Sequence, residues 1–366
     1  MKKLLFITSL VLLTLSCDRE EPSFIVEVRL DNAQGRMIYL QKAMGLETMT
    51  IDSTMMKDSV VTFKTSLGDN DMYSLLVKGW RRPVDFFSDN ATVIISGDYQ
   101  NPRAITIEAS ESQKYINGVI EHCSKYDDNM RMYAQLQQEA KDANDILAVD
   151  SIQAYYDNEL EQKRLYLLDE LMDNNFMYGR PAHYLLNRYK YEFQFAELKQ
   201  IMDSFVDTTP SSNKERLQAY VAKLERVQEG QPILDFAQND ANGTPITLSE
   251  LAAEAPLLLV DFWASWCPDC RVENPNIVAV YNEFKDYGFQ ILGVSLDNNK
   301  DAWLDAIESD KLSWHHVSDL KGWANEASSM YAISFIPQNV LIKDGMIVGR
   351  NLTGGDLHKA VEEALK

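Results

Sequence analysis

Residues 256–275 of the 366-residue chain read PLLLVDFWASWCPDCRVENP. The first seven residues are nearly all apolar, which is typical of a β-strand buried on both faces. A Cys-x-x-Cys pair follows after four more residues, and Pro268 is well tolerated in the first turn of a helix. The stretch therefore predicts a buried strand, a short loop and a helix that begins at Cys267 and carries Cys270 in its first turn.

A cysteine at the start of a helix has surroundings that favour a reactive thiolate. The thiolate is the nucleophilic form, and an ordinary thiol titrates at about 8.5. A helix N-terminus offers unpaired N–H groups and about half a positive charge, which stabilise the anion. Two intervening residues bring the second sulfur beneath the first. Cys267 is therefore predicted to attack a disulfide, and Cys270 to resolve the mixed disulfide.

Strand and helix patterns alternate around this stretch, from residue 230 to the end of the chain. A second apolar run covers residues 289–296, and helices are predicted at 267–286, 301–309 and 355–365. Two further strand patterns flank Lys343-Asp344-Gly345, which is a hairpin signal. Parallel strands with helical crossovers, followed by a hairpin and a helix, are the order of a thioredoxin fold.

The run from Asp261 to Arg271 is similar to the active-site run of thioredoxins and of their exported TlpA/ResA-like relatives. Residues 230–236, Asn242-Gly243 and residues 248–251 match the same family. The resemblance covers residues 230–366 and implies an α/β thioredoxin-like domain that exchanges thiols and disulfides. We expect no cofactor and no metal.

Further site residues follow from this resemblance. Ile336-Pro337 stands where the family places a cis-proline facing the cysteines, which implies that the main chain of Ile336 pairs with a client. Glu273 matches the active-site glutamate of ResA-like proteins, and Asp261 matches the buried aspartate of thioredoxins. Either carboxylate, buried and with a raised pKa, could carry a proton to or from Cys270. Glu273 is the first candidate and Asp261 the second.

Two more residues concern the client. Trp266 is expected to lie near the substrate, while Trp263 packs and shields the site. Gln338 stands where the family more often has Thr, which implies a different client preference.

Asp269 places a negative charge between the two sulfurs and so disfavours a strongly oxidising pair. We therefore expect a reductase rather than an oxidase.

Other functions for the cysteines are weaker. A Cys-x-x-Cys pair can be half of a zinc site, but the other half is missing. His315 and His316 are adjacent, so on a strand they point to opposite faces and are expected to be ordinary strand residues. A peroxiredoxin-like peroxidase is an alternative, but its reactive cysteine needs a Thr three residues earlier, where this chain has Ala264.

Residues 23–108 are predicted to form a small β-rich domain. Runs with strand character, separated by turn signals, cover residues 24–30, 37–41, 60–65, 72–78 and 91–96. Their spacing is typical of an antiparallel sheet or sandwich. This segment and the helices after it resemble the poorly characterised modules that precede such domains in bacterial lipoproteins.

Residues 109–229 are predicted to form a helical module, because apolar residues recur at helical spacing and glycine is scarce. Gly230-Gln231-Pro232 marks the next domain boundary. The β-rich and helical modules make up more than half of the chain. An alternative function is therefore a lipid-anchored binding platform in which the redox domain is secondary.

The first 17 residues resemble a bacterial lipoprotein signal peptide. Lys2 and Lys3 precede an apolar stretch that is too short to span a membrane and ends in Leu13-Thr14-Leu15-Ser16-Cys17. The resemblance implies that Cys17 carries a lipid. It also implies that the protein belongs to the cell envelope and is anchored to a bacterial membrane. The outer membrane is the first candidate, and the body of the protein would face the periplasm or the exterior.

Composition limits the partners. The chain has 35 Lys and Arg against 55 Asp and Glu, a formal net charge of −20, which repels nucleic acid. Four cysteines are too few for a disulfide scaffold, and Cys123 is predicted to be a small buried residue of a helix. The expected partners are a protein client with a disulfide or dithiol, and an upstream thiol redox partner.

Overall fold

The computed structural model describes residues 23–44, 47–66, 71–88, 92–109, 111–172, 179–205 and 212–366. The expected signal peptide and Cys17 lie outside these residues. The described chain divides into two compact units. The first comprises the described residues up to Glu170 together with 179–185 and 212–213, and the second comprises 171–172, 186–205 and 214–366.

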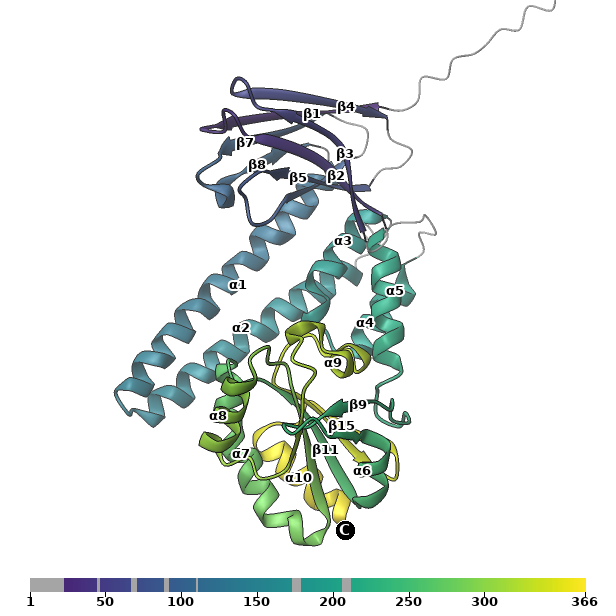
Figure 1. The fold of residues 1–366 in the computed structure, drawn as a ribbon. Helices are drawn as coiled ribbons and strands as arrows, with labels where there is room; N and C mark the ends of the chain where they lie inside the picture. Colours follow the sequence, from purple (N-terminus) through teal and green to yellow (C-terminus); the bar gives the residue numbers. More distant parts are fainter. Residues whose placement is uncertain are drawn as a thin grey trace, which may run out of the picture. The chain divides into compact units, whose positions relative to one another are not determined.

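The strands of the first unit build a β-sandwich-like region (Figure 1). They span Ser23–Asp31 (β1), Met37–Met44 (β2), Glu47–Met55 (β3), Val60–Ser66 (β4), Asp71–Val77 (β5), Val84–Ser88 (β6), Val93–Asp98 (β7) and Thr106–Glu108 (β8), and a short 3-10 helix spans Pro102–Ala104 (η1). They form two four-stranded sheets with the orders β4-β1-β7-β8 and β3-β2-β5-β6.

Strand β1 shows why this region folds as two sheets. Phe24, Val26, Val28 and Leu30 are buried, whereas the residues between them are more exposed, which is the alternation of a strand with one face on a core. β1 pairs with β4 in the antiparallel sense but with β7 in the parallel sense. The expectation of a purely antiparallel sheet is therefore wrong for this one pair.

Helices follow the β-rich region, as predicted. They span Glu111–Asp142 (α1), Ile146–Met172 (α2), Arg180–Tyr189 (α3), Phe195–Ser204 (α4) and Ser212–Glu225 (α5), and a 3-10 helix spans Lys190–Glu192 (η2). Cys123 is buried in α1, as predicted. The division between the two compact units falls inside this helical region, with α1 in the first unit and α4 in the second.

The second unit contains a five-stranded sheet, β13-β12-β11-β14-β15. Its strands span Leu257–Trp263 (β11), Phe289–Ser295 (β12), His315–Val317 (β13), Gln338–Lys343 (β14) and Met346–Arg350 (β15). β11 is central, runs parallel to β12 and antiparallel to β14, and all seven of its residues are buried. This is the thioredoxin order that the sequence predicts.

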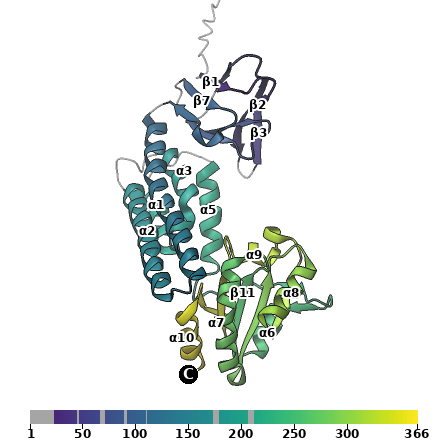
Figure 2. The same cartoon turned by 90° about the vertical axis from the view of Figure 1, so that its left-hand side faces the viewer.

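Helices cover both faces of this sheet. They span Leu248–Glu254 (α6), Pro268–Phe284 (α7), Lys300–Asp310 (α8), Glu326–Met330 (α9) and Gly354–Leu365 (α10). α7 contacts both α8 and α10, and in Figure 1 α7 and α8 lie on the opposite side of β11 from α6; Figure 2 turns the side of α7 and α8 toward the viewer. A small antiparallel pair, Ala237–Asn239 (β9) and Pro245–Thr247 (β10), precedes α6, and short 3-10 helices span Lys285–Tyr287 (η3) and Gly322–Ala324 (η4).

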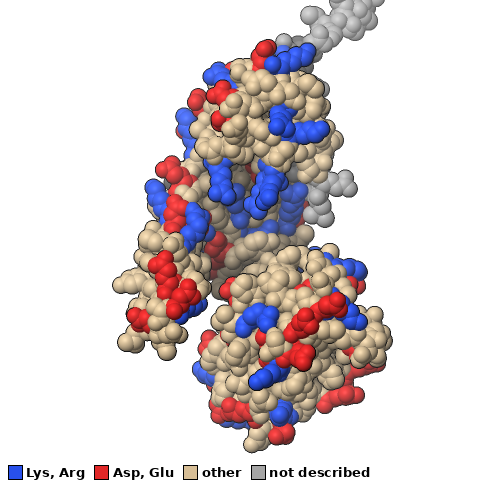
Figure 3. All heavy atoms as spheres, turned by 60° about the vertical axis from the view of Figure 1, so that its left-hand side comes forward, with Lys and Arg blue, Asp and Glu red and all other residues tan. Residues whose placement is uncertain are grey.

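The helices of the described chain lack the combination of length and apolar character that crossing a membrane requires. Acidic and basic side chains are interspersed on the face of the thioredoxin-like domain that Figure 3 shows.

Candidate active site

The two cysteines lie where the central strand gives way to α7. Cys267 is the N-cap of α7, and the main-chain N–H of Cys270 donates a hydrogen bond to its sulfur at 3.1 Å. The pair forms a disulfide with a Cα–Cα distance of 5.3 Å. Cys267 is 4% exposed and Cys270 is 1% exposed. The outer sulfur therefore sits at the positive end of the helix, where a thiolate is stabilised.

The loop that leads into β14 faces the disulfide. The Ile336–Pro337 peptide is cis, as the resemblance implies, and the carbonyl oxygen of Ile336 lies 3.6 Å from the sulfur of Cys267. Gln338 is buried and holds this loop from behind. Its side-chain oxygen accepts a hydrogen bond from the N–H of Ser334 at 3.1 Å, and its amide donates to Asn351 at 2.9 Å.

Two exposed aromatic side chains lie together next to the cysteine motif. Trp266 is 48% exposed, and its ring lies 6.1 Å from that of Trp323, which is 53% exposed. Trp263, in contrast, is buried and packs edge-on against His316 at 5.7 Å. Exposed large aromatic side chains that gather beside a reactive group are typical of a surface that binds a partner.

Asp261 is a buried carboxylate of the central strand that leads to the cysteines. It belongs to β11, is 2% exposed, and its Oδ1 makes no hydrogen bond within the described chain. Burial, and secondarily the negative charge of Glu273, raises the pKa of Asp261 to about 7. A carboxylate with such a pKa exchanges protons near neutral pH.

Glu273 occupies a different environment. It is half-buried on α7, and its Oε1 accepts hydrogen bonds from the side chain of Asn276 at 2.7 Å and from the N–H of Gly354 at 2.8 Å. The structure thus brings the two predicted carboxylates into electrostatic contact with each other. Within the described residues neither makes a hydrogen bond to a cysteine.

A network that the sequence did not reveal fixes the loop before Cys267. The carboxylate of Asp297 accepts hydrogen bonds from the N–H and the hydroxyl of Ser265, at 2.9 and 2.6 Å. Ser295 donates to the same carboxylate at 2.8 Å. Arg271, one residue after Cys270, donates to the carbonyl of Ser265 at 3.3 Å.

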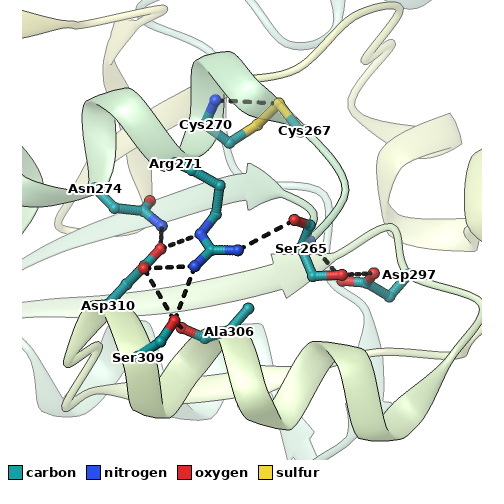
Figure 4. A network of polar contacts seen from close by, with 9 residues as sticks. All are labelled: Ser265, Cys267, Cys270, Arg271, Asn274, Asp297, Ala306, Ser309 and Asp310. Atoms are coloured by element: carbon teal, nitrogen blue, oxygen red, sulfur yellow. Dashed lines mark hydrogen bonds and ion pairs between the residues drawn. A yellow bond between two sulfur atoms is a disulfide. The ribbon is translucent and has the colours of Figure 1, made fainter.

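The same arginine ties α7 to the end of α8 (Figure 4). Its guanidinium binds the carboxylate of Asp310 through two nitrogens and also donates to Ser309 at 2.8 Å, while Asn274 donates to Asp310 at 2.7 Å. Hydrogen bonding to Asp310 raises the pKa of Arg271. Burial opposes the ionised form of Asp310, but its hydrogen bonds to Arg271 and Asn274 prevail and lower its pKa.

The two histidines are strand residues, as predicted. His315 is exposed and His316 is buried on β13. Burial lowers the pKa of His316 to about 4, so this imidazole is neutral at physiological pH. Among the described residues, no group of three or more His, Cys, Asp or Glu side chains could hold a metal ion.

Sequence reasoning missed Asp297, Asp310 and Ser265. The bonds that join them to the active-site helix and loop cross 32 to 39 residues of chain. A local pattern carries no signal of such pairing. Ser265 and Arg271 both lie inside the active-site run, Arg271 directly after Cys270, but nothing in that run indicated their distant partners.

Comparison with known proteins agrees with this geometry. Residues 230–350 match the model of the AhpC/TSA family, and residues 24–116 match a domain of unknown function (DUF4369). Fold and site together define a thioredoxin-fold thiol–disulfide oxidoreductase.

Two relatives show more closely which family of oxidoreductases the chain belongs to. The thiol-disulfide oxidoreductase ResA of Bacillus subtilis is 30% identical over 136 residues, which are 37% of this chain and 73% of that protein. ResA of Bacillus cereus is 27% identical over 150 residues, 41% of this chain and 83% of that protein. The chain therefore belongs to the ResA family of thiol–disulfide oxidoreductases.

A solved structure is also similar to the last domain. The C-terminal domain of a putative thiol-disulfide oxidoreductase from Bacteroides thetaiotaomicron is 35% identical and covers 38% of this chain and 97% of its own, with a TM-score of 0.36.

Proposed function

We propose that this protein reduces disulfides of protein clients outside the cytoplasm, with Cys267 as the attacking thiol and Cys270 as the resolving thiol. The observation that carries the proposal is the position of Cys267. Its sulfur lies at the N-terminus of α7 and 3.6 Å from the carbonyl oxygen of Ile336. A client strand that pairs with this carbonyl would present its disulfide to the nucleophile.

The reaction proceeds in two exchange steps. The thiolate of reduced Cys267 attacks one client sulfur, the client S–S bond breaks, and a mixed disulfide forms. Cys270 then loses its proton and attacks the sulfur of Cys267, which releases the second client sulfur as a thiol. The client gains two electrons and two protons, and the protein is left with the Cys267–Cys270 disulfide. An upstream dithiol partner reduces that disulfide again.

We assign the proton transfer at Cys270 to the carboxylate pair, with Asp261 in the direct role. Asp261 has a pKa of about 7 and an oxygen without a hydrogen-bond partner in the described chain, so it can accept and return a proton near neutral pH. Glu273 already accepts two hydrogen bonds through Oε1. Its negative charge supports Asp261 by raising the pKa of that residue.

The direction of electron flow follows from Asp269. This exposed residue stands in the first turn of α7, between the two cysteines. Its negative charge opposes the thiolate and so favours the disulfide form of the protein. A cysteine pair that favours its disulfide form has a low reduction potential, so it donates electrons to clients rather than accepting them.

The cellular setting rests on the sequence. The lipoprotein-like start and Cys17 support a lipid anchor on a bacterial membrane, the outer membrane first, with the body facing the periplasm or the exterior. We further propose domain limits at 23–108, 109–229 and 230–366, because the type of secondary structure changes close to these positions.

Trapping tests the proposed chemistry. In a Cys270→Ser variant the mixed disulfide cannot be resolved, so reduced protein is expected to accumulate as a covalent adduct with a disulfide-bearing client. The matched control is Cys267→Ser, which keeps the inner thiol but lacks the attacking one. The proposal fails if both variants form adducts equally, or if neither does.

A peroxidase is the second candidate, because the matched family model also bears the name AhpC/TSA. Ala264, three residues before Cys267, is buried and has no hydroxyl to hold a peroxide. We expect no thiol-dependent consumption of hydrogen peroxide above that of a model dithiol. Rapid consumption that depends on Cys267 would favour the peroxidase instead.

A further inference from the structure

A cavity of about 550 Å³ adjoins the loop that faces the disulfide. It lies wholly within the second compact unit. One wall comes from Tyr191, from residues 193–195 and from the segment around Tyr220 and Gln228; the other comes from the loop at Ser334 and Phe335 and from Arg350. A volume of this size is typical of pockets that bind ligands.

Neighbouring residues of the chain connect the cavity to the redox site. Phe335 immediately precedes Ile336, whose carbonyl oxygen lies 3.6 Å from the sulfur of Cys267. The side chain of Ser334 lies close enough to Tyr220 on the other wall to influence the pKa of that phenol. Any polypeptide that pairs with Ile336 therefore has its neighbouring residues beside this cavity.

Arg350 is the charged group inside the cavity. Its guanidinium donates to the carbonyl oxygens of Val227 at 2.6 Å and of Tyr331 at 3.3 Å. These bonds use two of the five N–H groups of an arginine. Within the described chain no carboxylate forms an ion pair with Arg350, although buried charges in proteins are normally paired.

Among the described residues around Arg350, none supplies a compensating charge within hydrogen-bond reach. Burial lowers its pKa, and the groups that oppose this effect are the hydroxyls of Tyr220 and Tyr331. A second cation, Lys190, lies over the rings of Tyr191 and Tyr220 at 5.0 and 5.3 Å. Glu229 is the carboxylate among the lining residues, and it is exposed at the edge.

The mouth of the cavity is aromatic. Tyr191 is 53% exposed and Phe335 is 51% exposed, so both rings present apolar surface to solvent. Amide groups of Gln194 and Gln228 line the same space. A carboxylate on a short stem would find a cation and amide donors inside, and apolar contact at the entrance.

We propose that this cavity is a specificity pocket for an acidic side chain, Asp or Glu, that lies within a few residues of the client's reactive cysteine. The inference rests on the proposed disulfide reduction and names its substrate class, clients with an acidic residue beside the disulfide. Charge complementarity carries it: the body of the protein is strongly acidic, yet among the described lining residues the half-buried charge is the cation Arg350, whereas the carboxylate of Glu229 is exposed.

Short blocked peptides test this proposal. Each contains one cysteine, is linked as a symmetric disulfide, and carries Glu, Gln, Lys or Phe at one position on either side of the cysteine. The full chain in its reduced form is mixed with each peptide, and the rate of free-thiol release is measured. We expect Glu to react about fivefold or more faster than Gln at one position, and Lys to be slowest.

Two variants locate the effect. Arg350→Gln removes the cation, and Gln228→Glu keeps it but supplies a carboxylate from within the cavity. In both, the ratio of the Glu rate to the Gln rate is expected to fall to about one. The second variant covers the case in which loss of the Arg350 bonds to Val227 and Tyr331 unfolds the domain. Lys359→Gln, an exposed cation on α10, is the matched control and keeps the ratio.

The proposal is overturned if Glu and Gln react equally at every position, if Phe is preferred, or if the preference persists in both variants. Hydroxyethyl disulfide separates this result from failure of the proposed function. Wild-type protein that reduces this small neutral disulfide but shows no charge preference contradicts the pocket alone. Wild-type protein that reduces no disulfide contradicts both.

Discussion

The carboxylate of Asp297 accepts both hydrogen bonds that Ser265 donates, at 2.9 Å from its N–H and 2.6 Å from its hydroxyl. Ser265 lies two residues before Cys267, and Asp297 lies two residues after the end of β12. The loop that carries the attacking cysteine is thereby fixed to the end of a buried parallel strand. The position of the sulfur therefore depends on a residue 30 positions further along the chain.

Asp297→Asn is expected to weaken this connection. An amide has one acceptor oxygen and an N–H₂ group, so it cannot accept all the hydrogen bonds that Ser265 and Ser295 donate to the carboxylate. Unfolding by denaturant should show a loss of about 1–3 kcal/mol. Asp305→Asn, an exposed change on α8, should stay within about 0.5 kcal/mol of the wild type. Equal stability of the two variants would contradict the structural importance of Asp297.

The raised pKa of Asp261 predicts how stability depends on pH. In the folded chain this carboxyl holds its proton up to about pH 7, whereas in the unfolded chain it releases the proton near 3.8, the ordinary pKa of an aspartate. Between these values the folded state binds more protons, so this residue makes stability fall as pH rises from about 4 to 7. Above the folded pKa the penalty is complete and constant.

Asp261→Asn should remove that penalty. At pH 8 the variant is expected to be more stable than the wild type by roughly 2–4 kcal/mol, and at pH 4 the two should differ little. The same variant should resolve its mixed disulfide about tenfold or more slowly, because the proton acceptor for Cys270 is lost. Denaturant unfolding at both pH values and single-turnover kinetics measure the two effects. A variant with wild-type kinetics would remove Asp261 from the mechanism.

Asp269→Asn tests the direction of electron flow. Removal of the negative charge between the cysteines should lower the pKa of the Cys267 thiol and raise the reduction potential by roughly 10–30 mV, because a stabilised thiolate favours the dithiol form. Asp301→Asn changes a first-turn acidic residue of α8 and is the matched control. A wild-type potential near the value of about −120 mV typical of DsbA would contradict the assignment as a reductase.

Gly293 on β12 leaves no space for a side chain. A Cβ there would lie 2.4 Å from Nδ1 of His316 and 3.2 Å from Nε1 of Trp263, and both rings are buried. Gly293→Ala should therefore cost about 1–3 kcal/mol of stability. Gly355→Ala, where nothing lies within 4 Å on α10, should be neutral or slightly stabilising. A thermal melt of each variant decides the comparison, and a neutral Gly293→Ala would contradict the packing described.

Much of the redox domain could be predicted from its sequence. The helix expected at 267–286 appears as Pro268–Phe284 followed by η3, and the hairpin around Asp344 appears with the expected strands. These elements are predictable because a buried strand, a helix start and a tight turn each have a local chemical signature.

The β-rich region was predicted less completely. Strands β3, β6 and β8 were not expected. β3 is rich in Thr, Ser and Met and lies at the edge of its sheet, where exposure on one side removes the apolar alternation that marks a strand. β8 has three residues, too few to show a period. The predicted strand end at Ala91 lies outside the described residues.

Some residues of the candidate site could likewise be predicted from the sequence, and others could not. Cys267, Cys270 and Pro337 belong to short motifs, so the sequence indicated them. Asp297 and Arg350 contribute through contacts with residues far along the chain, and the folded structure alone brings them together. Long-range pairing of this kind has no period and no motif from which to infer it.

The order of the strands along the chain also determines when, during synthesis, the active site can be completed. β11 lies between β12 and β14, and Ile336 follows Cys267 by 69 residues. A chain that emerges from its N-terminus therefore exposes both thiols before the loop that will cover them has been made. During this interval the oxidation state of the pair is set by the surrounding compartment and not by the finished fold.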